Sequence, residues 1–249
     1  MKISHTDHRP WALPQRPWIM AQVWRDLLFA HWPVRADDLR RLVPPPLTLD
    51  TYEGQGWITV AAFRMSGIRL RGLFPLPLLS ASLELNVRTY VTVGNCPGVF
   101  FFSLDADNRA GVALGRLWYH LPYFRAEMSL RHFAETIHYS SRRLGRNAPA
   151  AEFVCRYRPV GEVFRSVPGT LDHWLTERYC LYSIDSRDRV CRAEIHHAPW
   201  PLQPAAAEID VNRMTIPLGL ALPAASPLLH FAPKLEVVVW SPERVSELQ

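Results

Sequence analysis

Hydrophobic and polar positions alternate most regularly over residues 82–91, SLELNVRTYV. A strand has a period of two residues, so apolar or β-branched side chains share one face of this segment and polar ones the other. The polar face would carry Glu84, Asn86, Arg88 and Tyr90. Two interpretations of that face stay open. It is either the solvent face of a sheet, or it lines a pocket inside a barrel, where Glu84 and Arg88 could meet through a shared ligand.

Further runs of β-branched and aromatic residues, separated by turn-forming residues, predict many more strands. The expected strands cover residues 57–65, 82–93, 99–104, 110–119, 137–142, 152–158, 179–184, 190–196 and 235–240. Helices are expected at residues 36–43, 127–135 and 171–178. Many closely spaced strands and few helices predict a mainly β fold, a barrel or a sandwich with a few short flanking helices.

Composition indicates a globular chain. A β-rich chain of 249 residues is expected to form one domain, residues 1–249. Hydrophobic residues make up 48% and charged residues 20%, which argues against disorder. The net charge of +5 raises the question of nucleic-acid binding. However, the 26 arginines (28 basic residues less Lys2 and Lys234) are scattered and form no basic run, so we expect no nucleic-acid partner.

Motifs for cofactors, metals and membranes are missing from the sequence. It contains no GxGxxG, P-loop or GxSxG pattern, and its four cysteines show no CxxC spacing. We therefore expect no cofactor and no metal. Charged and polar residues interrupt the hydrophobic stretch 19–32, and the first ten residues are polar. A membrane span needs about 20 apolar residues. We expect a cytoplasmic protein without a membrane partner, and the sequence leaves a homo-oligomer open.

Several phrases spread along the chain resemble the YqjF-like family of bacterial proteins, whose activity is not established. They are LLFAHWPV (27–34), LELNVRTYV (83–91), FFSLDADN (101–108), LPYFRAEM (121–128), LTERYCLY (175–182) and IHHAPWPLQ (195–203).

A more distant resemblance, to acetoacetate decarboxylases, bears more directly on the mechanism. DDLRRLVPPPLTLD (37–50) is similar to their early helix and proline stop, and GRLWYHLPYF (115–124) is similar to their active-site segment. The resemblance implies a β-barrel around a closed pocket. It also places Glu84 on the family's active-site glutamate, Arg25 on its arginine, and Arg116 within the matching Gly-Arg pair.

The same alignment puts Tyr123 where the decarboxylases have their Schiff-base lysine. A phenol cannot form an imine, so the family's own route is not expected here. The two lysines offer no clear substitute, since Lys2 lies at the terminus and Lys234 opens the last expected strand. His120, three residues before Tyr123, could act as a general acid or base near neutral pH.

Two hypotheses from different classes follow. The first is a lyase-like enzyme that acts on a small oxo-acid or related anionic metabolite without an imine. Glu84 and His120 would move protons, and Tyr123 would donate a hydrogen bond to a developing oxyanion. Substrate would be bound by Arg25, Asn86, Arg88 and Arg116, because a guanidinium suits a carboxylate. The second is a non-catalytic ligand-binding or structural barrel.

The adjacent His196 and His197 would point to opposite faces of a strand, so at most one of them would enter a pocket.

Overall fold

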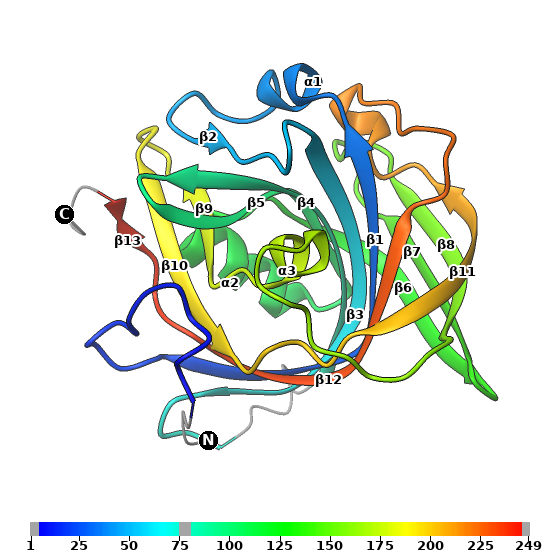
Figure 1. Ribbon diagram of the computed structural model, residues 1–249, viewed down its shortest axis with the longest axis horizontal. Helices are drawn as coiled ribbons and strands as arrows, with labels where there is room; N and C mark the ends of the chain where they lie inside the picture. The colour runs from blue at the N-terminus through cyan, green and yellow to red at the C-terminus, as the bar shows by residue number, and fades with distance from the viewer. Residues whose placement is uncertain (1–4, 75–80, 246–249) are drawn as a thin grey trace.

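Long strands close on themselves to form a β-barrel, as the computed structural model of residues 5–74 and 81–245 shows (Figure 1). Its principal strands are β1 (Met20–Val34), β3 (Gly56–Leu70), β4 (Ala81–Val93), β5 (Cys96–Ala106), β6 (Tyr123–Phe133), β7 (Thr136–Arg143), β8 (Glu152–Pro159), β9 (Cys180–Ile184), β10 (Val190–His197), β11 (Gln203–Asn212) and β12 (Leu228–Val239). Two short strands, β2 (Thr48–Leu49) and β13 (Glu243–Arg244), pair at the margins. The predicted mainly β barrel with a few short helices is confirmed.

The strands form two rings that share one wall. Nine strands of the described chain close in the order β5-β6-β7-β8-β11-β12-β1-β3-β4, with β4 pairing back onto β5. A second, smaller ring uses the same wall and closes through β9 and β10, because β9 pairs with β5 and β10 pairs with β12. In Figure 1, β1 and β3 run between the group of β9 and β10 and the group of β6, β7, β8 and β11.

The shared strands are buried on both faces, which explains their nearly continuous apolar sequence. On β1, Leu27 and Phe29 belong to the core of the smaller ring, whereas Leu28 and Ala30 belong to the core formed with β7 and β8. The same alternation on β4 sends Leu85 and Val87 into the second core. The polar residues between them therefore face the interior of the smaller ring, not bulk solvent.

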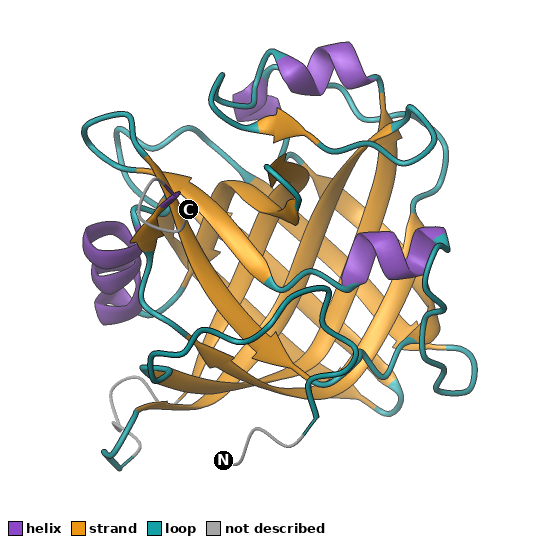
Figure 2. Cartoon of the chain, turned by 60° about the vertical axis from the view of Figure 1, so that its left-hand side comes forward, coloured by secondary structure: helices purple, strands orange, loops and turns teal. Residues whose placement is uncertain are grey.

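Short helices lie at the periphery of the strands (Figure 2). They are α1 (Ala36–Arg40), α2 (Arg109–Tyr119), α3 (Leu171–Thr176) and a 3-10 turn, η2 (Ile216–Leu218). The described residues contain no helix long and apolar enough to cross a membrane.

The strand predicted at residues 110–119 is wrong, because this segment is helix α2. The Asn108 side chain caps it by accepting from the Gly111 amide. Its buried residues are Val112, Gly115 and Tyr119, a helical spacing that an apolar composition hides.

The helix predicted at residues 127–135 is also wrong. Residues 123–133 form β6, which turns at Ala134 (φ 52°) and pairs antiparallel with β7. Pairing in this hairpin overrides the helical propensity of the local sequence. Strands β1 and β11 were not predicted. The expected helices at 36–43 and 171–178 are present but shorter.

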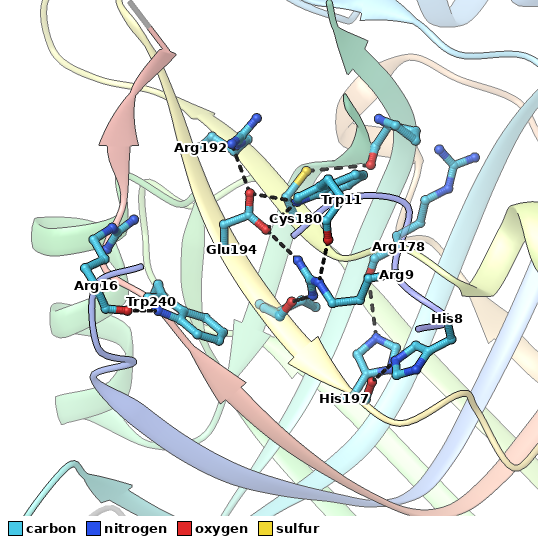
Figure 3. A network of polar contacts seen from close by, with 12 residues as sticks. His8, Arg9, Trp11, Arg16, Arg178, Cys180, Arg192, Glu194, His197 and Trp240 are labelled. Carbon is cyan, nitrogen blue, oxygen red and sulfur yellow. Dashed lines mark hydrogen bonds and ion pairs between the residues drawn. The ribbon is translucent and has the colours of Figure 1, made fainter. Parts of the chain in front are cut away.

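The N-terminal segment crosses the outer face of β10 and is held there by buried polar contacts (Figure 3). Arg9 donates to the Ile195 carbonyl at 2.6 Å and pairs with the Glu194 carboxylate at 2.8 Å. The Trp11 indole donates to the same carboxylate at 2.9 Å. These contacts join residues more than 180 positions apart in the chain, and they hold the N-terminal segment against the wall of the smaller ring.

Candidate functional site

A cavity of about 150 Å³ lies inside the smaller ring, between the shared wall, β9, β10 and helix α2. Most of its lining is apolar, with aromatic side chains such as Trp24, Phe63 and Trp200. A few polar groups converge on it, chiefly from β4. Such a mostly apolar cavity with a few fixed polar groups is the usual form of a small-molecule site.

Glu84 is the central acid of the cavity, with only 4% of its surface exposed. The Tyr123 hydroxyl donates to its Oε2 at 2.8 Å, and the Asn86 amide lies 3.4 Å from its Oε1. Burial raises the pKa of the Glu84 carboxyl to about 7, although both hydrogen bonds oppose that shift. Near neutral pH this group can therefore both accept and release a proton.

Arg88 brings a cation into the same cavity, two same-face positions further along β4. Its guanidinium lies 4.8 Å from the centre of the Phe29 ring. Within the described chain, its Nε and Nη2 have no hydrogen-bond partner, nor has the Asn86 Oδ1. Burial lowers the pKa of Arg88, while the neighbouring Tyr90 hydroxyl acts to raise it. Unpaired donors of a buried guanidinium are suited to receive an anion.

Arg178 is a second cavity cation that sequence reasoning missed. It follows α3, donates from Nε to the Trp174 carbonyl and pairs through Nη1 with Asp50 at 2.6 Å. Its Nη2 has no partner among the residues that the structure describes. Its charge contributes, after burial, to the lowered pKa of Arg88. No local motif marks it, since its position depends on how α3 folds against the barrel.

Tyr123 reaches Glu84 because the adjacent helix has no side chain in its way. A Cβ on Gly115 of α2 would lie 2.4 Å from two carbons of the Tyr123 ring. Burial and the Glu84 charge raise the pKa of the Tyr123 phenol well above its usual value, so it stays a donor. The Gly115 position in the decarboxylase-like segment thus has a steric basis.

Three of the candidate residues are not at the cavity. Arg25 precedes a β-bulge at Asp26 (φ 55°) and points to the opposite face of β1, where its Nε donates to the Ser66 hydroxyl. Arg116 is exposed and its Nε donates to the Tyr123 carbonyl at 2.7 Å, so it braces the strand rather than facing a ligand.

His120 is the third. It is the exposed C-cap of α2, with a left-handed backbone (φ 53°), and its side chain lies at a shallow surface depression beside Trp118 and Arg187. The structure therefore brings together Glu84, Asn86, Arg88 and Tyr123, and it corrects the expected placement of the other three candidates.

His196 and His197 of β10 point to opposite faces of the strand, as its period of two requires. His197 lines the cavity and is held by backbone carbonyls of Ala198 and Arg178. His196 faces the N-terminal segment, where its ring stacks on that of His8. Burial lowers the pKa of both imidazoles, that of His196 to about 4.

No lysine of the described residues reaches the cavity. Lys234 lies on β12 opposite Arg25, is about half exposed and pairs with Glu236 at 3.2 Å. Lys2 is outside the described residues. Likewise, residues 5–74 and 81–245 contain no group of three His, Cys, Asp or Glu side chains that could hold a metal ion.

Comparison with known proteins gives the chain relatives in sequence and in structure. Residues 21–236 match the family model DUF2071, described as an uncharacterized conserved protein. The chain is 47% identical over 229 residues to the uncharacterized protein YqjF of Bacillus subtilis (strain 168), covering 92% of this chain and 93% of that one.

Solved structures share the fold at low sequence identity. The enduracididine biosynthesis enzyme MppR complexed with pyruvate aligns with a TM-score of 0.62 and 10% identity, over 96% of this chain and 94% of that chain. Acetoacetate decarboxylase from Legionella pneumophila aligns with a TM-score of 0.62 and 12% identity, over 96% and 93%. The fold is thus that of acetoacetate decarboxylase-like proteins, and on its sequence the chain belongs to the DUF2071 family together with YqjF.

Proposed function

We propose that this protein is an enzyme that moves a proton at the carbon beside the carbonyl of a short oxo-acid, without forming an imine. The observation that carries the proposal is the pairing, in one cavity, of a carboxyl whose pKa is about 7 with an arginine whose donors are unpaired. Binding of pyruvate by MppR, which shares the fold, supports the choice of substrate class.

The carboxylate of the ligand would be bound by Arg88 and Arg178. Each offers unpaired N–H groups, and a planar guanidinium binds a carboxylate through two parallel hydrogen bonds. Asp50 neutralises Arg178, which leaves the charge of Arg88 for the ligand. The Cα atoms of Glu84 and Arg88 are about 13 Å apart along the strand. The Asn86 side chain lies between them on the same face, and the cavity volume of about 150 Å³ suits an acid of a few carbons.

Glu84 would take the proton from the substrate carbon. As the C–H bond of that substrate carbon breaks, its electron pair forms a carbon–carbon double bond and the π electrons of the carbonyl move to the oxygen, which gives an enolate. Glu84 becomes the neutral acid that can return the proton. The Tyr123 hydroxyl, which donates to Glu84 in the free protein, would turn to that oxygen. Such a donor lowers the barrier because the negative charge develops there. A base with a pKa near the working pH is best suited to this step.

A non-catalytic ligand-binding barrel is the alternative. It is favoured by the mostly apolar lining and by the lack of a lysine among the described cavity residues. The two functions differ in one respect: a binding protein would hold the oxo-acid without exchanging its protons.

The test is exchange of the methyl protons of pyruvate in D2O, followed by NMR. We expect the wild-type protein to accelerate exchange and Glu84→Gln to slow it by at least about 10²-fold, the usual contribution of a general base. Arg88→Gln should chiefly raise KM. The matched control is Glu127→Gln, because Glu127 is an exposed carboxylate paired with Arg142 on the outside of the barrel.

Three outcomes separate the possibilities. Binding without exchange of pyruvate, 2-oxobutyrate or acetoacetate would favour the binding barrel, and neither binding nor exchange would refute both. Borohydride added during exchange should trap no covalent adduct. An adduct mapped to Lys234 would show that an imine forms after all.

A further inference from the structure

A chain of hydrogen-bonded side chains runs from α3 into the barrel, beyond the Arg88 end of the cavity. His230 on β12 joins the Asp172 carboxylate at 3.1 Å through Nε2 and the His31 Nε2 at 3.3 Å through Nδ1. The His31 Nδ1 lies 2.8 Å from the Thr59 hydroxyl, which lies 2.7 Å from the Tyr90 hydroxyl. Four of these five residues are buried, and Asp172 has 37% of its side chain exposed.

With Asp172 ionised and both rings neutral, the donors in this chain point toward Asp172, and burial lowers the pKa of His230, which favours its neutral form. A carboxylate only accepts, so the His230 Nε2 carries a proton and its Nδ1 accepts from the His31 Nε2. The His31 Nδ1 then accepts either from Thr59, with Thr59 accepting from Tyr90, or directly from the Tyr90 hydroxyl, which lies 3.4 Å away. Burial, together with the charges of His230 and Arg88, lowers the pKa of His31 well below its usual value, so that its ring stays neutral as this arrangement requires.

The direction of the chain fixes Tyr90. Its proton is given to Thr59 or to His31, so in both arrangements the Tyr90 hydroxyl is held at one place in the barrel. Arg88 lies on the same face of β4, two residues before Tyr90. Its guanidinium packs 4.8 Å from the centre of the Phe29 ring, which itself stacks on the His31 ring at 5.6 Å. The Arg178 guanidinium covers the Tyr90 ring at 5.0 Å. Arg88 thus packs beside the ordered Tyr90 and Phe29 side chains, while its Nε and Nη2 have no partner among the described residues.

We propose that Asp172, His230, His31 and Thr59 are positioning residues, which through the packed Tyr90 and Phe29 side chains hold the Arg88 guanidinium in place to bind the anionic end of the ligand. The ligand role rests on the proposed function, whereas the positioning of Arg88 does not. The Asp172 carboxylate, which contacts His230, would then influence a ligand carboxylate bound several side chains away.

The first measurement uses the free protein. Nitrogen-15 NMR of the imidazoles should show both His31 and His230 protonated on Nε2, and the Arg88 Nε–H should exchange slowly with water. Asp172→Ala should mix the His230 tautomers and speed exchange of the Arg88 Nε–H. Asp172→Asn should restore both signals, because an amide oxygen accepts the same hydrogen bond. Finding His31 or His230 protonated on Nδ1 in the wild type would overturn the inference.

The second measurement uses pyruvate. Asp172→Ala should weaken binding about tenfold, as expected for loss of one well-placed charged hydrogen bond, with the exchange rate at saturation nearly unchanged. The control is Asp38→Ala, since Asp38 also lies in the first turn of a helix and is 38% exposed but contacts only surface arginines. Equal weakening by both variants, or failure of Asp172→Asn to restore binding, would refute positioning. If the wild type binds no oxo-acid, the proposed function fails while the NMR signals still decide the positioning of Arg88.

Discussion

At the level of single residues, burial determines what the Glu84 carboxyl can do. Removing it from water raises its pKa to about 7, and Tyr123 and Asn86 limit the shift by hydrogen bonding. A carboxyl in this state is useful as a base but costs stability when ionised. The position of this residue was predictable, because the period of two along residues 82–91 puts Glu84, Asn86 and Arg88 on one face. The sequence could not show that this face is interior, since that depends on β9 and β10 closing the smaller ring.

Glu84→Gln should therefore stabilise the fold at high pH. A carboxyl whose folded pKa exceeds its unfolded one loses stability as pH rises from about 4.5 through 7. A shift of this size corresponds to about 3 kcal/mol at pH 8, which the neutral amide avoids. At pH 4 the two proteins should differ little through protonation. Urea unfolding at both pH values measures this. A Glu84→Gln variant that is less stable than wild type at pH 8 would show that Glu84 has an unrecognised cationic partner.

At the level of elements, α2 shows where sequence reasoning failed. Residues 110–119 are rich in apolar side chains, and a short apolar run does not distinguish a strand from a helix by period alone. The cap by Asn108 and the buried Gly115 decide the outcome in the structure. The prediction that Arg25 lies at the cavity was wrong for a related reason. The bulge at Asp26 changes which side chains of β1 point into the smaller ring. Bulges and helix caps are local features of the backbone that an alignment of short sequence segments does not detect.

The same helix allows a paired test within one element. Gly115→Ala would place a methyl 2.4 Å from the Tyr123 ring, so the phenol must move away from Glu84. We expect a loss of about 1–3 kcal/mol from overpacking. The pKa of Glu84 should also rise above about 7, because the Tyr123 hydrogen bond lowers it. Gly111→Ala is the control, since its Cβ would meet only Asn108 atoms at 3.8 Å or more. Carboxyl carbon-13 NMR and thermal unfolding report the two effects; a Glu84 titration unchanged in Gly115→Ala would refute the steric role.

At the level of the whole molecule, polar residues distant in sequence are gathered inside or against the barrel wall and deprived of water. His31 and His230 are 199 positions apart yet share a hydrogen bond, and no sequence pattern could have joined them. Burial lowers the pKa of each of four histidines, which are His31, His196, His197 and His230. The fold therefore depends on keeping these imidazoles neutral.

This dependence predicts that the protein loses stability in mild acid. A histidine with a lowered folded pKa binds its proton more readily when unfolded, so stability falls as pH drops below about 6.5. Each such group costs about 1.4 kcal/mol per pH unit until its folded pKa is reached, and for His196 that point is about pH 4. Glu84 and Asp105 act the opposite way, because burial raises their pKa values. Four histidines act one way and two carboxyls the other, so we expect the free energy of unfolding to fall as pH drops from 6.5 to 5.

Urea unfolding at half-unit steps of pH measures the slope of this fall directly. His31→Asn should be less stable at pH 8, because it interrupts the chain to His230, yet its slope below pH 6.5 should be smaller by about one proton. His120→Asn is the matched control: His120 is exposed and its left-handed backbone suits asparagine, so both stability and slope should stay near wild type. If the wild-type slope is zero or of opposite sign between pH 6.5 and 5, the buried imidazoles do not govern the acid limit. Stability would then be set by the carboxyl groups of the barrel interior.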